Sequence, residues 1–158
     1  MHNLDLKFMR RALNCARQGV RFGQTPFGAC IVKHNRMIAM GHNLVWQKKN
    51  IILHAEMVAI GRACRVLKSI DLSGCTIYST CEPCPMCFAA CHWARIKRIV
   101  FGASIRDAQN YGFNEMTLSN AKLKKIIKSK IGLTSGVGMN ESRALFKFWQ
   151  AQGAARVY

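Results

Sequence analysis

Two short motifs carry the residue types that hold a metal ion. The first is His54-Ala55-Glu56, and the second, about 30 residues later, is Pro83-Cys84-Pro85-Met86-Cys87. Two cysteines three positions apart on a helix lie on one face and can bind one ion together. With His54 as a third ligand, the fourth tetrahedral position of a zinc ion stays open, as catalytic zinc requires. The sequence therefore predicts one Zn²⁺ per subunit, with a catalytic water as its fourth ligand and with the protein ligands His54, Cys84 and Cys87.

Glu56 is predicted to move protons rather than to bind the metal, because it lies two positions beyond a ligand. A carboxylate there can take a proton from the water and deliver protons to a ring nitrogen and to departing ammonia. Each motif alone is a weak signal. Together, in this order and with Pro83 before the first cysteine, they form the signature of zinc-dependent nucleobase deaminases. The pattern predicts hydrolytic removal of an exocyclic amino group.

A second interpretation of the cysteines is an iron–sulfur protein. Cys81, Cys84, Cys87 and Cys91 have the C-x2-C-x2-C-x3-C spacing of bacterial ferredoxins. Three features oppose it: His92 stands where that motif has proline, no second cysteine run follows, and residues 84–94 have a helical pattern. A nucleic-acid-binding module with a structural zinc is a third interpretation, and it needs Cys81 as fourth ligand. We expect Cys81 and Cys91 to be structural thiols near the site.

The elements that must position these residues alternate between strand and helix patterns along one domain, residues 1–158. Helical spacing predicts a first helix within residues 1–20, and Pro83 is placed to open a helix that runs to about Ala94. Strands are predicted at 26–33, 36–42, 75–80 and 97–103, and further helices at 54–68, 118–129 and 141–152. This alternation predicts an α/β layered fold.

Composition bounds the remaining possibilities. The 158 residues are 50% hydrophobic, enough for a core without disulfides, and the net charge is +17. That charge favours a polyanionic partner such as nucleic acid, or else a solvated basic surface. No apolar run approaches the length of a membrane span. The charges scattered through residues 1–20 argue against a secretory signal, and a first helix explains that segment better than a transit peptide, so a cytoplasmic location is expected.

The chain resembles the cytidine-deaminase-like superfamily through His54-Ala55-Glu56 and Cys81-Glu82-Pro83-Cys84-Pro85-Met86-Cys87. It is most similar to the purine branch, which holds bacterial guanine deaminases and tRNA adenosine deaminases. The resemblance covers nearly the whole chain and includes Thr25–Ala29, Gly41–Asn43 and Trp93–Arg95. It implies a three-layer α/β/α fold with a mixed central sheet, and a homodimer or larger assembly.

Some features resemble guanine deaminase in particular. Gly112-Phe113-Asn114-Glu115 is similar to the Gly-Phe-Asp-Asp stretch of that family, and Tyr158 ends a segment like its tail. In that family the tail is exchanged between subunits, and its tyrosine closes the partner's pocket. The resemblance implies that Asn43 hydrogen-bonds a purine, that two aromatic side chains sandwich it, and that Glu115 contacts the base or assists proton transfer. The implied substrate-binding residues are Phe27, Asn43, Ala55, Trp93 and Tyr158; the alternatives are a turn asparagine, core aromatics and a surface glutamate.

The chain also departs from both purine families. Asn50-Ile51-Ile52-Leu53 stands where they carry Asp-Pro-Thr or Asp-Pro-Ser and a small residue, so the pocket is expected to be more apolar. Asn114-Glu115 replaces two aspartates. The first prediction is conversion of guanine to xanthine and ammonia. The alternative is adenosine-to-inosine editing of tRNA, which suits the +17 charge, and a cytosine or cytidine deaminase ranks below both.

Overall fold

A mixed five-stranded sheet forms the centre of the computed structural model, which describes residues 2–153 and 156–158. The strands lie in the order β2-β1-β3-β4-β5. β1 pairs antiparallel with both β2 and β3, whereas β3, β4 and β5 are parallel. Their bounds are β1 Gly28–Lys33, β2 Arg36–His42, β3 Thr76–Cys81, β4 Arg98–Ala103 and β5 Gly132–Thr134.

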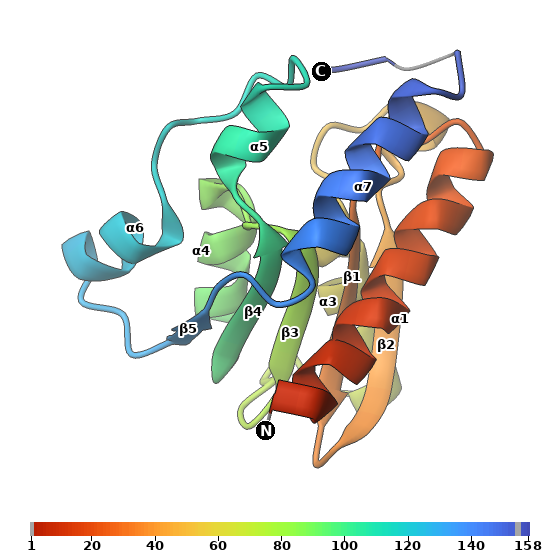
Figure 1. Cartoon of the computed structure of the whole chain (residues 1–158). Helices are drawn as coiled ribbons and strands as arrows, with labels where there is room; N and C mark the ends of the chain where they lie inside the picture. The colour runs from red at the N-terminus through yellow and green to blue at the C-terminus, as the bar shows by residue number, and fades with distance from the viewer. Residues whose placement is uncertain (1, 154–155) are drawn as a thin grey trace.

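Helices cover both faces of this sheet, as Figure 1 shows. Helices α1 (His2–Arg21) and α7 (Met139–Gln150) lie side by side on one face, and α3 (Ala55–Leu67) and α4 (Pro85–Trp93) pack on the other. The shorter helices are α2 (Val45–Lys48), α5 (Ile105–Gln109) and α6 (Asn120–Ile126). The predicted three-layer α/β/α fold with a mixed sheet is confirmed.

Two of the three hydrophobic clusters among the described residues follow from the alternation of side chains along each strand. Ile31, Ile77 and Ile99 point toward α3 and α4 and pack with the fully buried Phe88. Their neighbours on the same strands point the other way, toward α1 and α7. Because both faces are covered, the central strands β1 and β4 are almost continuously apolar, and neither shows an alternation of polar and apolar residues.

Close packing of α3 on the sheet requires a glycine in β2. A Cβ atom added at Gly41 would lie 2.7 Å from the Val58 side chain and 3.0 Å from the Ala59 nitrogen. The missing side chain lets the helix that carries Glu56 approach the strand directly. Within the part of the chain that is described, no helix is both long and apolar enough to cross a bilayer.

The predicted helices and strands are present, although some of their ends are shifted, and the structure contains three further elements. The helix expected to open at Pro83 begins at Pro85, because Cys84 has the extended backbone of an N-cap (φ −64°, ψ 167°). The helix predicted at 118–129 is shorter, because Ser119 caps its start and Lys128 adopts a left-handed conformation (φ 53°) after its end. Helices α2 and α5 and the edge strand β5 were not predicted.

Candidate active site

The three predicted metal ligands meet where two neighbouring helices begin. His54 is the N-cap of α3, Cys84 is the N-cap of α4, and Cys87 lies in the first turn of α4. The His54 Nδ1 atom is 3.6 Å from the Cys84 sulfur and 3.7 Å from the Cys87 sulfur. A tetrahedral zinc ion with ordinary Zn–N and Zn–S bonds holds such atoms about 3.6 Å apart. The arrangement therefore fits zinc.

The local electrostatics favour a thiolate at this point. A hydrogen bond with Cys87 lowers the pKa of Cys84 to about 4, and the interaction with His54 acts in the same direction. A deprotonated sulfur is the form that binds a metal. In the described part of the chain, one group of three or more His, Cys, Asp or Glu side chains lies close enough together to share an ion. It consists of His54, Cys84 and Cys87.

The other two cysteines of the ferredoxin-like spacing do not join this group. Cys81 is buried, and its thiol donates a hydrogen bond to the Ser104 carbonyl (3.3 Å). Cys91 is fully buried in the core between the sheet and α4. Neither sulfur belongs to the group that can share one ion, which argues against the iron–sulfur interpretation, and both side chains are buried, as a structural thiol would be.

Glu56 lies beside the ligands, on the first turn of α3. One carboxylate oxygen accepts a hydrogen bond from Ser79 (2.8 Å), and the other faces the Cys87 sulfur (3.5 Å). The side chain is buried, and burial together with the negative charge of Cys84 raises the pKa of Glu56. A carboxyl group whose pKa is raised and whose orientation is fixed suits proton transfer. Ser79, which no motif singled out, fixes that orientation from β3.

The predicted ligand for a purine, Asn43, is fully buried and held from two sides. Its side-chain oxygen accepts a hydrogen bond from the Val45 N–H (3.0 Å), and its amide nitrogen donates one to the Tyr158 hydroxyl (2.6 Å). The Asn43 N–H also bonds the Phe27 carbonyl (3.1 Å). The amide nitrogen is thus aimed at the position that Tyr158 now fills.

A cavity of about 250 Å³ opens beside the ligands. Its wall includes Glu115, whose pKa is raised to about 7 by burial and by the charges of Cys84 and Glu56. Ile51, from the loop that departs from both purine families, also lines it, so that wall is apolar as predicted. The remaining lining residues are His54, Cys84, Pro85, Met86, Asn114, Met116 and Tyr158.

Tyr158 lines this cavity from within the same chain. Its ring centroid is 5.5 Å from that of His54 and 5.8 Å from that of Phe113. The Tyr158 carbonyl accepts a hydrogen bond from the Asn114 N–H (3.2 Å). Before it, the Arg156 carbonyl accepts from the Trp46 indole (3.1 Å), and the Arg156 guanidinium lies over the Trp46 ring at 4.7 Å. Arg156 and Tyr158 are therefore held by several contacts, two of which involve Trp46 of the unpredicted α2.

Two implied substrate-binding residues, Ala55 and Trp93, do not line the cavity. Trp93 ends α4, nine residues beyond Cys84, and its side chain is 83% exposed and outside the cavity wall. At 1.5 Å per residue, it lies about 14 Å along the helix from that ligand. Ala55 is fully buried in the core between α3 and the sheet. Phe27, by contrast, lines the narrow inner part of the site together with Glu56 and Tyr158.

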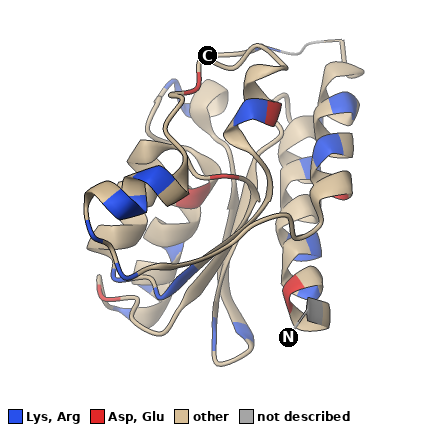
Figure 2. Cartoon of the chain, turned by 60° about the vertical axis from the view of Figure 1, so that its left-hand side comes forward, with Lys and Arg blue, Asp and Glu red and all other residues tan. Residues whose placement is uncertain are grey.

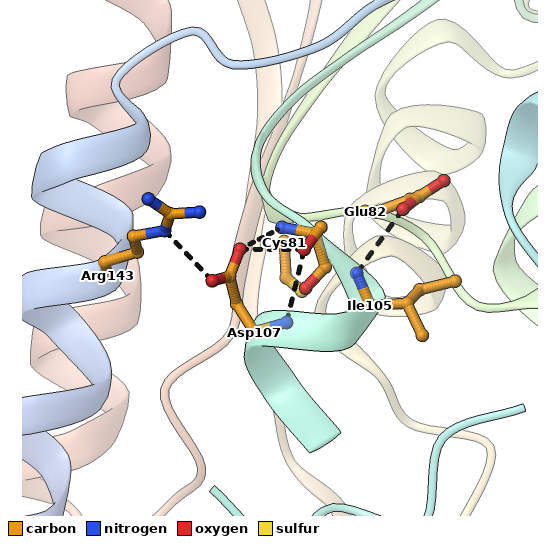
Figure 3. A network of polar contacts seen from close by, with 6 residues as sticks. Cys81, Glu82, Ile105, Asp107 and Arg143 are labelled. Atoms are coloured by element: carbon orange, nitrogen blue, oxygen red, sulfur yellow. Dashed lines mark hydrogen bonds and ion pairs between the residues drawn. The ribbon is translucent and has the colours of Figure 1, made fainter. Parts of the chain in front are cut away.

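Polar contacts behind the site connect it to α5, α6 and α7. The Glu82 carboxylate accepts hydrogen bonds from the Ile105 N–H (3.3 Å) and from the Asn120 N–H (2.8 Å), which are the first residues of α5 and α6. Figure 3 shows the first of these contacts, and beside it Asp107, which bonds Ser104 and the Arg143 guanidinium (2.9 Å). Glu82 thus joins the end of β3, just before the ligand helix, to the segment that carries Glu115.

Residues 2–103 match the family described as the cytidine and deoxycytidylate deaminase zinc-binding region. The chain belongs to this family. It is therefore a zinc-dependent hydrolytic deaminase, and the match contains both ligand motifs.

Relatives within this deaminase family act on different substrates. Over 109 residues the chain is 44% identical to a guanine deaminase of Bacillus subtilis, covering 68% of this chain and 70% of the relative. Over 99 residues it is 40% identical to a tRNA-specific adenosine deaminase of the same organism, covering 63% and 62%. A solved guanine deaminase from Nitrosomonas europaea superposes with a TM-score of 0.86 at 26% identity, covering 92% and 84%.

Proposed function

We propose that the chain hydrolyses guanine to xanthine and ammonia. The observation that carries this proposal is the position of Tyr158: its ring lies against His54 and covers part of a cavity of about 250 Å³ beside the ligands, which is large enough for a free base. A free base can be enclosed there, whereas a nucleotide in tRNA must enter with its ribose and phosphates attached. The similarity to a guanine deaminase at 44% identity supports the same choice.

His54, Cys84 and Cys87 would hold the metal, and zinc bound there acts as a Lewis acid that lowers the pKa of water. Glu56 is the proton carrier. It accepts a proton from the attacking water, then protonates the ring nitrogen and the leaving amine, so that guanine and water give xanthine and ammonia. Ser79 holds one oxygen of Glu56, and the other lies on the side of the metal ligands, 3.5 Å from the Cys87 sulfur.

The remaining residues bind the base. The Asn43 amide donates a hydrogen bond to an acceptor on the purine once the Tyr158 hydroxyl has moved from it. Glu115 faces the cavity, and because its pKa is about 7 it can hold or release a proton near neutral pH. Phe27 packs on the inner side. Tyr158 covers the base after entry, which excludes bulk water from the reaction.

The test is ammonia release by zinc-loaded protein supplied with guanine, guanosine, adenosine, cytosine and tRNA in parallel. We expect release from guanine, and a fall of about 10²-fold or more in kcat for Glu56→Ala. That variant should still bind one zinc per chain, measured by elemental analysis. Ser79→Ala is the graded control: it leaves the carboxylate present but free to rotate, so its loss should be smaller. Activity retained in Glu56→Ala would refute the assigned role.

The second candidate is adenosine-to-inosine editing of tRNA. It is favoured by the net charge of +17 and by the 40% identity to a tRNA-specific adenosine deaminase. Inosine formed in tRNA, with no ammonia from free guanine, would establish it and reject the guanine proposal. Deletion of Tyr158 distinguishes the two further, because it should impair a free-base enzyme and leave editing intact.

A homodimer and a cytoplasmic location are also proposed, on the resemblance to the deaminase superfamily. Tyr158 reaches the cavity of its own chain, so a monomer has the residues needed to close the site. Light scattering combined with activity at nanomolar concentration tests whether assembly is required. Loss of activity on dilution to monomers would indicate a tail exchanged between subunits.

A further inference from the structure

A second hollow lies at the opposite end of α4 from the metal ligands. It is a groove of about 550 Å³ between the end of α4, the start of β4 and the chain that leads from α6 to β5. We call it the basic groove, because five of its lining side chains are Arg, Lys or His: His92, Arg95, Lys97, Lys128 and Lys130. Of the described residues that line it, none is Asp or Glu.

The sequence around the basic groove carries almost no compensating charge. Residues 83–106 contain four Lys or Arg, residues 116–140 contain five, and neither stretch contains an acidic residue. Figure 2 shows basic segments along α6 and the chain after it. Asp71 contacts Arg95 at 3.0 Å, but this ion pair is exposed and neutralises one cation only. The groove therefore has an uncompensated positive potential.

The backbone of the groove is fixed before any ligand arrives. The Lys97 N–H bonds the Cys75 carbonyl, and the Lys97 carbonyl accepts from the Gly132 N–H, both at 2.9 Å. Ile96 and Ile131 are buried beneath it. A hydrogen-bonded floor with exposed cationic side chains is suited to a ligand that presents charge at several points.

Two of the groove cations occupy backbone positions that favour glycine. Arg95 follows α4 with φ 58°, and Lys128 follows α6 with φ 53°, both in the left-handed region. A side chain in that conformation is less stable than glycine. A positive charge at a helix C-terminus is favourable, which offsets part of this cost. These two positions therefore permit a substitution by glycine that removes charge without straining the backbone.

We propose that the basic groove binds the phosphate backbone of a single-stranded nucleic acid. The cations continue beyond the groove onto α6, where Lys122 and Lys125 are exposed, so the surface matches a row of phosphates better than one isolated phosphate. Base-edge recognition is not required, because contacts to phosphate carry no sequence information. The groove lies about 14 Å along α4 from Cys84, and the proposal does not depend on which base the deaminase acts on.

The test is fluorescence anisotropy of a labelled 12-nucleotide oligouridylate titrated with the full-length, zinc-loaded protein at several salt concentrations. Wild type is compared with the double variant Arg95→Gly/Lys128→Gly. The matched control is Lys49→Gly/Lys68→Gly, which removes the same charge from two left-handed positions that do not line the groove. Lys97→Gln/Lys130→Gln, at exposed positions, is a second groove variant that does not change the backbone.

Both groove variants should weaken binding about tenfold at low salt and reduce the slope of log K against log salt by about 1.4, since each phosphate contact contributes about 0.7. The control should change binding less than about twofold, and all variants should keep their ammonia release and melting temperature. Oligodeoxyuridylate of the same length should bind alike. Equal weakening in the groove variants and the control, or no binding by wild type, would overturn the proposal.

Discussion

Glu82 is expected to stabilise the start of two helices with one carboxylate. Its oxygens accept from the Asn120 N–H at 2.8 Å and from the Ile105 N–H at 3.3 Å. Hydrogen bonds to a charged group contribute roughly 1.5–3 kcal/mol each. Because Glu82 is half-buried, we assign the bond from Asn120 an energy near the low end of this range. The bond from Ile105 is long, so we assign it about half of that energy. Glu82→Ala should then cost about 2–3 kcal/mol, or about 4–12 °C in Tm for a chain of this size.

The assay is urea unfolding of zinc-loaded protein, followed by tryptophan fluorescence. Glu82→Gln keeps one oxygen acceptor but loses the charge, so its stability should fall between wild type and Glu82→Ala. Glu141→Ala is the control: it removes a carboxylate from the first turn of α7 and should cost less than about 1 kcal/mol. If Glu82→Ala unfolds within about 0.5 kcal/mol of wild type, or if the control costs as much, the two bonds do not contribute as reasoned.

Three further outcomes are expected. Phe88→Ala should lower the free energy of unfolding by about 3–5 kcal/mol, because the ring is fully buried; a loss below 1 kcal/mol in chemical denaturation would contradict that packing. Burial raises the pKa of Asp5, but hydrogen bonds from Arg98 and Tyr78 outweigh it and hold this pKa below its usual value of 3.8. The contribution of ionised Asp5 to folding stability is therefore present above about pH 3.8 and is lost as the pH falls through the lower folded-state pKa. The stability advantage of wild type over Asp5→Asn should therefore shrink below about pH 4 in acid titrations, and a difference independent of pH would refute it. Removal of zinc by a chelator should lower Tm, and re-addition at a hundred times Kd should restore about 2.7 kcal/mol, but not in Cys84→Ser; the same recovery in that variant would show that the metal binds elsewhere.

The metal group could be predicted from the sequence because its geometry is mostly local. Cys84 and Cys87 share one turn, and His54 precedes Glu56 by two residues, so the spacing alone fixes their relative positions once two helices begin side by side. The central strands β1 and β4 were also predictable, since both faces of the sheet are covered and their apolar runs are nearly continuous. Short elements were harder. Helix α5 did have a signal, because Ser104 and Asp107 form a capping box.

Residues placed by tertiary contacts could not be found in the same way. Ser79 reaches Glu56 from a strand 23 residues later, and no spacing rule connects them. The role of Trp93 stays a prediction: nine residues at about 1.5 Å each separate it from Cys84 along α4, so it does not line the cavity of its own chain. The position of Tyr158 at the cavity rests on contacts with Asn43, His54 and Phe113, which are distant in sequence.

Part of the cavity wall comes from residues 114–116 and Tyr158, all beyond the stretch 2–103 that matches the deaminase family. The metal ligands and Glu56 lie within that stretch. Selection can therefore remodel this part of the wall without disturbing the groups that break the carbon–nitrogen bond. A change of substrate can therefore begin with these wall residues. Exchanging residues 112–118 and the last residues of the chain, 156–158, between relatives is a practical way to alter substrate preference.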